Sequence, residues 1–145
     1  MFPLNTNILF RIRGSKMISL NEFKNASNVS NVFSKLFHMR DTAHYAHLRT
    51  KSYAQHKALG SFYDDVLGLA DQFIETYQGQ YGLQKFEIQG VDSSDIDIVK
   101  YLEDSAKFIL ESHSALEKKD THLHNIIDEI AGLLYQTLYK LKNLK

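Results

Sequence analysis

Residues 44–77 read HYAHLRTKSYAQHKALGSFYDDVLGLADQFIETY, and this stretch decides the fold. Apolar side chains in its second part recur at intervals of three and four, which is the spacing of one face of an α-helix. The members of this stripe are Leu59, Phe62, Val66, Leu69, Ala70, Phe73 and Tyr77. The polar run RTKS interrupts the pattern at 49–52. The stretch therefore predicts one helix that ends near Leu48 and a second helix over 53–77.

The first of these helices extends back to about Ser19. Its apolar face is made by Val29, Val32, Phe33, Leu36 and Phe37. The only proline is Pro3, so no later position forbids a long helix. Beyond the second helix, Gly79 and Gly82 are stop signals, and residues 79–93 are typical of an irregular connection.

Two further helices follow this connection. Asp97 stands three residues after Ser94, and the pair is a capping signal that predicts a third helix from Ser94 to about Lys118. The break EKKD then leads to a fourth helix that begins near Asp120. Its broad apolar face comprises Leu123, Ile126, Ile127, Ile130, Leu133, Leu134, Leu138 and Leu141.

Two helices, a long connection and two more helices indicate an all-α fold. A four-helix bundle with one long crossover has the connectivity of ferritin-like proteins. We therefore expect a ferritin-like four-helix bundle domain over 19–143, with the long crossover between helices two and three. Residues 1–18 would form an N-terminal tail.

The composition excludes several classes of function. The chain has 145 residues with 17 basic and 17 acidic side chains, so its net charge of zero gives no overall attraction to nucleic acid. The absence of cysteine removes disulfides, thiolate metal sites and cysteine nucleophiles. No apolar run is long enough to span a bilayer.

The N-terminal residues do not match a signal peptide. They lack an early positive charge, and Arg11 and Arg13 interrupt their apolar stretch. We expect a soluble cytoplasmic protein without a membrane partner. Arg11, Arg13 and Lys16 offer only weak support for contacts with DNA phosphates, and a solvated or docked tail is the simpler interpretation.

Candidate metal ligands occur outside the usual in-bundle pattern. The chain contains no Glu-x-x-His sequence, so a di-iron site within one bundle is not expected. Instead, His44 is followed by His56 after twelve residues, Asp71 after fifteen more and Glu75 after four more. Asp71 and Glu75 lie one turn apart on the same side of a helix. Two carboxylates with imidazoles suit iron or another divalent metal ion.

The spacing requires two chains. His56 and Asp71 share one helix and would lie roughly 22 Å apart along it, so they cannot bind one ion in a single chain. Asp71 and Glu75 also point away from the apolar stripe. A second apolar strip lies beside them, made by Tyr63, Leu67 and Ile74. If two copies pack through this strip about a twofold axis, the histidines of one copy meet the acids of the other.

The stretch 44–77 and the ending DTHLHNIIDEIAGLLYQTLYKLKNLK at 120–145 resemble the Dps family, the small ferritins of starved cells. The likeness covers about residues 19–143. It implies a metal site in which His44 and His56 come from one subunit and Asp71 and Glu75 from its twofold mate. It also implies a hollow dodecameric shell that oxidises Fe²⁺, often with hydrogen peroxide, and stores the iron as mineral.

The chain departs from the family pattern at four positions. Tyr45 stands where the family usually has Trp, Ala46 replaces its Asn, and Arg49 replaces the Gly of the turn. Gly60 stands where the family has an acid that helps to hold a second metal ion. One iron per site is therefore favoured over two. The alternative function is a ferritin-like structural or interaction protein that has lost ferroxidase activity.

The remaining histidines are expected to be surface or hydrogen-bonded side chains. They are His38, His113, His122 and His124, with His47 a further imidazole one turn from His44. His122 and His124 do not share a helix face and make a poor pair. Asp120 shares a face with His124, but we expect it to cap the fourth helix.

Overall fold

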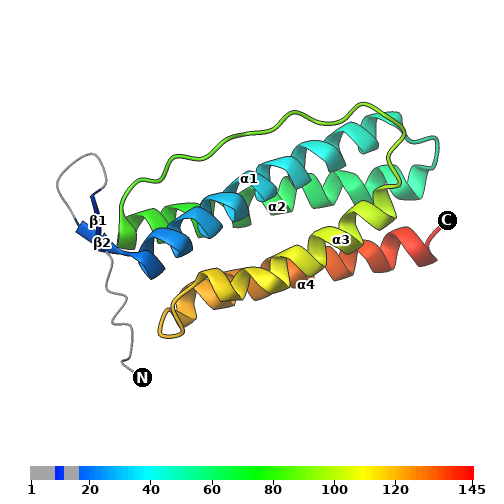
Figure 1. Cartoon of the computed structure of the whole chain (residues 1–145). Helices are drawn as coiled ribbons and strands as arrows, with labels where there is room; N and C mark the ends of the chain where they lie inside the picture. The colour runs from blue at the N-terminus through cyan, green and yellow to red at the C-terminus, as the bar shows by residue number, and fades with distance from the viewer. Residues whose placement is uncertain (1–8, 12–16) are drawn as a thin grey trace, which may run out of the picture.

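The computed structural model describes the backbone of residues 9–11 and 17–145, and side chains from Val29 onward. Its helices are α1 (Leu20–Arg49), α2 (Tyr53–Tyr81), α3 (Ile98–Glu111), the short 3₁₀ helix η1 (Ser112–Ala115) and α4 (Thr121–Asn143). Figure 1 shows the four α-helices packed side by side. The prediction of an all-α fold with four helices is confirmed for this bundle.

Two short strands precede the bundle. β1 (Leu9–Arg11) pairs antiparallel with β2 (Met17–Ser19), which leads directly into α1. The segment expected to be a tail therefore contains a strand pair. The side chain of Arg11 and all of Arg13 and Lys16, which sequence analysis considered for DNA contacts, lie outside the described residues.

Helix α2 is longer than predicted. Its start is as expected, because the hydroxyl of Ser52 accepts a hydrogen bond from the Gln55 amide and caps the first turn. The predicted stop at Gly79 is wrong, and α2 continues to Tyr81. The helix ends where Gly82 adopts a φ of 89°, a conformation that favours glycine, and its N–H donates to the Gln78 carbonyl.

Helix α3 starts later than predicted. Ser94 is not its cap, because its amide donates to the Asp92 carboxylate in a local turn. Asp97 caps the helix instead, by accepting a hydrogen bond from the Lys100 amide. The α-helix also ends early, at Glu111, and η1 replaces its expected last turns.

The connection over 82–97 contains neither helix nor strand. Figure 1 shows it running along the length of the α1–α2 pair, so that α3 begins near the end where α1 finishes. Phe86 packs this connection against α1. The Phe86 ring meets Phe33 edge-on at 5.4 Å between centroids and stacks on Phe37 at 5.7 Å.

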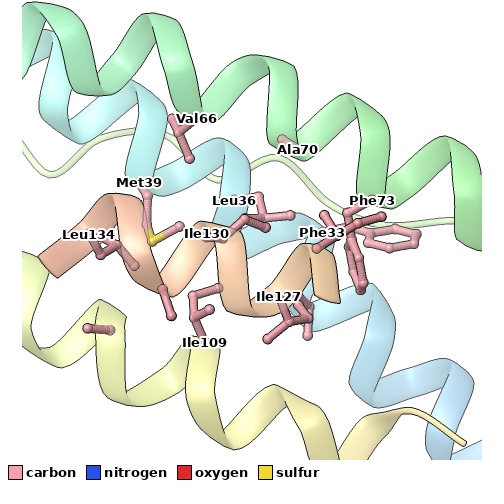
Figure 2. Close-up of a cluster of buried hydrophobic side chains, with 14 of the residues drawn as sticks. Phe33, Leu36, Met39, Val66, Ala70, Phe73, Ile109, Ile127, Ile130 and Leu134 are labelled. Carbon is pink, nitrogen blue, oxygen red and sulfur yellow. The ribbon is translucent and has the colours of Figure 1, made fainter. Parts of the chain in front are cut away.

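All four helices contribute to one hydrophobic core, and Figure 2 shows its central part. The fully buried large side chains are Phe33, Leu36 and Met39 from α1, Leu59, Phe62 and Phe73 from α2, Leu102 and Ile109 from α3, and Leu123, Ile127, Ile130 and Leu134 from α4. The face of each helix that remains outside this core is where candidate sites lie.

Candidate metal-binding site

Three imidazoles and a phenol gather where α1 ends and α2 begins. The short turn over 50–52 holds the two helices antiparallel, so His44 and His47 of α1 face His56 and Tyr63 of α2. The rings of His47 and His56 stack with centroids 3.7 Å apart and planes inclined by 20°. His44 stacks on Tyr63 at 4.1 Å. The structure therefore brings the two predicted histidine ligands into one cluster.

Reciprocal hydrogen bonds fix His47 and His56. Nδ1 of His47 lies 2.7 Å from the His56 carbonyl oxygen, and Nδ1 of His56 lies 3.0 Å from the His47 carbonyl oxygen. A carbonyl oxygen only accepts, so both Nδ1 atoms carry the hydrogen. This leaves both Nε2 lone pairs available, in the arrangement that metal-binding histidines use.

Gly60 makes this packing possible. A Cβ atom at Gly60 would lie 3.1 Å from Cε1 and 3.2 Å from Nδ1 of His47, tighter than nine in ten real Cβ contacts, so the ring would have to shift by a few tenths of an ångström. The position that the family resemblance marks as missing an acid is therefore filled in space by an imidazole. Gly60 and His47 are both evident in the sequence, but their close contact becomes evident only in the structure.

Asp71 and Glu75 are exposed on α2, and the structure shows no hydrogen bond or ion pair for either within the described residues. They lie away from the histidine cluster of the same chain. Among residues with described side chains, no group of three or more histidines and acids is placed to hold one metal ion. A site built from all four predicted ligands would need a second copy, and it stays a prediction.

The second apolar strip on α2 is weaker than predicted. Ile74 is 7% exposed and belongs to the core of its own chain, and Tyr63 is half-buried beneath His44. Leu67, at 37% exposed, is the member that remains on the surface. Polar groups therefore dominate this face, from His56 through Asp64 to Glu75.

A second histidine pair, which sequence analysis missed, lies at the α3–α4 hairpin. Nδ1 of His113 in η1 is 2.6 Å from Nδ1 of His124 in α4. Nε2 of His113 lies 2.8 Å from the Asp128 carboxylate, and Nε2 of His124 lies 3.1 Å from the Glu117 carbonyl oxygen. The sequence pattern that could have indicated this contact is a pair of histidines on either side of a tight break between two helices. His47 and His56 show the same pattern.

Asp120 occupies the N-cap position of α4, as predicted, but its buried side chain does not cap the helix. It precedes α4 but makes no side-chain capping bond, and its carboxylate accepts from Gln80 Nε2 at 2.9 Å and from the Tyr81 hydroxyl. Desolvation alone would raise the pKa of Asp120, but the hydrogen bonds from Tyr81 and Gln80 outweigh it and lower the pKa. The carboxylate thus ties the start of α4 to the end of α2.

Two other histidines have structural partners. Nδ1 of His38 lies 2.5 Å from the Tyr101 hydroxyl, and burial followed by the nearby Lys35 charge lowers the pKa of His38. Nε2 of His122 lies 2.8 Å from Oε1 of Gln80. Both agree with the expectation of hydrogen-bonded side chains.

Comparison with known proteins gives a family without an assigned function. Within the described residues, no helix combines the length and the hydrophobicity needed to cross a membrane. No solved structure matches the chain. The "uncharacterized 14.6 kDa protein in mobD-ri intergenic region" of Enterobacteria phage T4 is 33% identical over 100 residues, which span 68% of this chain and 75% of that protein. The model of a family of unknown function, DUF5856, matches residues 47–141, and the chain belongs to this family.

Proposed function

We propose that the protein is a divergent Dps-like iron-binding and iron-storage protein. Fe²⁺ would bind between two copies, with His44 and His56 from one and Asp71 and Glu75 from the other. Imidazole and carboxylate together suit Fe²⁺, and the carboxylates would stabilise the ferric product of any oxidation.

One observation carries this proposal: the outer face of α2 has the imidazole of His56 near one end and the unpaired acids Asp71 and Glu75 toward the other. Counted along the helix, His56, Leu67, Asp71 and Glu75 fall on one side of α2. If two copies of α2 pack antiparallel about a point between Tyr63 and Asp64, His56 comes opposite the partner's Asp71. The same operation places the second histidine–acid pair symmetrically.

The architecture supports the proposal in a second way. Two helices, a connection that returns along the bundle, and two more helices make the connectivity of ferritin-like folds. The outward face of α2 is exposed at Asp64, Leu67 and Asp71. A twofold partner would dock on this side.

The Gly60–His47 contact limits the proposed site. An acid at position 60 would help to hold a second ion, but the His47 ring occupies that space. The Nδ1 atom of His47 is already bound to a carbonyl, and its ring stacks face to face on His56. Stacked rings direct their lone pairs within nearly parallel planes, so the two cannot chelate one ion between them. We therefore propose one iron per shared site.

Anaerobic Fe²⁺ titration tests the proposal, followed by exposure to oxygen or peroxide. The wild type should bind one iron per chain, and Asp71→Ala should weaken uptake at least tenfold. Asp65→Ala is the matched control, because Asp65 is an exposed acid on a different side of α2. Equal uptake by all three proteins would disprove the site.

A mixing experiment tests whether the site is shared. His56→Ala and Asp71→Ala chains are each defective, but their mixed dimer contains one site with every ligand intact. Random reassociation should restore about a quarter of wild-type uptake, since half of the dimers are mixed and each regains one of two sites. A mixture that stays as inactive as its components would contradict a shared site.

A second candidate function is an interaction protein that keeps the bundle without iron chemistry. The filled space at Gly60 favours it, because the second metal position has lost its acid. Light scattering combined with metal analysis separates the two functions. An assembled protein that binds no iron would support the interaction protein, whereas a stable monomer would contradict both.

A further inference from the structure

The histidine pair at the α3–α4 hairpin meets head-on. The ring planes of His113 and His124 differ by 13° and their centroids are 4.9 Å apart, while their Nδ1 atoms are only 2.6 Å apart. The difference between the two distances is about the width of one imidazole ring. The rings therefore lie edge to edge in nearly one plane, and each Nδ1 points at the other.

The opposite nitrogens determine where the hydrogens lie. Nε2 of His113 faces a carboxylate oxygen of Asp128, and Nε2 of His124 faces the carbonyl oxygen of Glu117. Both partners act as acceptors, so both Nε2 atoms carry the hydrogen. A neutral imidazole has only one N–H. Both Nδ1 atoms therefore present lone pairs to each other.

Two facing lone pairs at this distance repel unless a cation lies between them. A proton is the smallest cation that can join them, and a metal ion is the other. Histidines that bind metal ions donate their second ring N–H to a carboxylate or a backbone carbonyl, which fixes the ring for coordination. His113 has the first kind of partner and His124 has the second.

The hairpin that carries the pair is held in place from several sides. The amide of Asp120 donates to the Glu117 carbonyl oxygen at 3.0 Å, the same oxygen that orients His124. The Asp120 carboxylate accepts from Gln80 and Tyr81 of α2. The hydroxyl of Ser112 donates to the Phe108 carbonyl beside His113. The two imidazoles are therefore preorganised on separate but anchored elements.

We propose that His113 and His124 bind a divalent transition-metal ion, such as Zn²⁺ or Cu²⁺, through their Nδ1 atoms. Imidazole nitrogen suits these ions, and water would fill the remaining coordination positions. Nitrogen ligands lie about 2.0–2.1 Å from zinc, so the two Nδ1 atoms would separate to roughly 3.4 Å around a tetrahedral ion. Both side chains are partly exposed, which leaves room for that rotation.

This site is separate from the proposed iron site. His47 and His56 lie at the α1–α2 turn, and Figure 1 places the α3–α4 turn at the opposite end of the bundle. The ligands also differ, because the iron site needs carboxylates from a second copy whereas the His113–His124 pair is complete in one chain. The two proposals can therefore fail independently.

Zn²⁺ titration calorimetry on the full-length Asp71→Ala protein tests the new site without the shared iron site. The intact pair should give one Zn²⁺ per chain, and adding either His113→Gln or His124→Gln should weaken binding at least tenfold. His122→Gln is the matched control, since His122 lies in the same turn of α4 and bonds only to Gln80. Asp128→Asn should weaken binding about tenfold by loosening His113.

Nitrogen NMR of the imidazoles gives an independent readout. Zn²⁺ should shift the Nδ1 resonances of His113 and His124 together and leave both Nε2 atoms protonated. The proposal is overturned if Zn²⁺ does not bind the intact pair, if both glutamine variants retain wild-type affinity, or if the ion shifts only one ring or an Nε2 atom. If Zn²⁺ does not bind at all, a shared proton alone would occupy the contact.

Discussion

The two helical hairpins of this protein each carry a histidine pair across their turn, and the pairs are built in opposite ways. In the α1–α2 hairpin, His47 and His56 give their Nδ1 hydrogens to each other's backbone and stack face to face. In the α3–α4 hairpin, His113 and His124 use Nε2 for outside partners and meet through Nδ1.

The comparison shows that the acceptor, not the spacing, decides what a histidine pair can do. The pairs are nine and eleven residues apart, across turns of similar tightness. When a carbonyl takes the Nδ1 hydrogen, the remaining lone pairs lie in parallel planes and need ligands from elsewhere. When acceptors take the Nε2 hydrogens, the remaining lone pairs converge.

The largest stability effect is expected from breaking the anchor of the α3–α4 hairpin. Asp120→Asn replaces a carboxylate that accepts at both oxygens with an amide that accepts at only one, so the hydrogen bond from either Gln80 or Tyr81 loses its charged acceptor. Hydrogen bonds to a charged group contribute about 1.5–3 kcal/mol, so we expect a loss of about 2 kcal/mol in the free energy of unfolding at pH 7. Urea denaturation measures it.

This effect should depend on pH in a defined direction. The pKa of Asp120 is lower in the folded protein than its ordinary value of about 3.9 in an unfolded chain. The stabilisation is therefore complete above about pH 4 and is lost as the pH falls through the folded pKa. The wild type and Asp120→Asn should become closer in stability toward pH 3. An unchanged gap would show that the carboxylate charge is not responsible.

A smaller effect on stability is expected from disturbing the His47–His56 pair through a substitution at Gly60. Gly60→Leu pushes into the His47 ring and should cost about 1–2 kcal/mol by overpacking. In a His47→Ala background the same substitution should be neutral or stabilising, because the ring is gone. Thermal melts of the four proteins give the coupling free energy.

Gly68→Leu is the matched control for this cycle. Gly68 also lies in α2, but a Cβ atom there would meet no other side chain within 4 Å. Replacing glycine within a helix normally gains up to about 1 kcal/mol. If Gly60→Leu and Gly68→Leu behave alike, His47 does not occupy the space at Gly60.

The smallest effect is expected at the outer partner of His113. The contact between His113 and Asp128 lies at the surface, where even a charged pair contributes about 0–1 kcal/mol. Asp128→Asn should therefore change the melting temperature of the metal-free protein very little and lower it clearly only when Zn²⁺ is present. A large loss without metal would assign Asp128 a structural role instead.

Periodicity was sufficient to predict the helices, because burial of one face determines where they form. The cap predictions that failed are those in which another group engages the expected cap residue. Ser94, Asp97 and Asp120 are all favourable cap residues by type, yet only Asp97 caps a helix, since Asp92 and the Gln80–Tyr81 pair engage the other two. The partners of Asp120 lie 40 and 39 residues away, so the local sequence contains no information about that competition.

The candidate sites show the same limit. His44 and His56 could be paired from spacing and resemblance, because the turn between their helices is short. The His113–His124 contact could not, since it depends on which ring nitrogen meets Asp128 and which meets the Glu117 carbonyl. From the sequence, Gly60 looked like the loss of a metal ligand. A glycine that replaces a ligand cannot be told apart in sequence from a glycine that leaves room for another side chain.

The Phe86 contact with α1 has a consequence for how the chain folds. Each hairpin joins its helices through a short turn, so it can form from local contacts. Phe86 lies just beyond the end of α2, so it can reach Phe33 and Phe37 once the α1–α2 hairpin has formed, and the rest of the connection must then run the length of the bundle before α3 can dock. Contacts that require long loops to close form slowly. We therefore expect two hairpins that fold early, with Phe86 packing as part of the first, and a docking step between them that limits the folding rate.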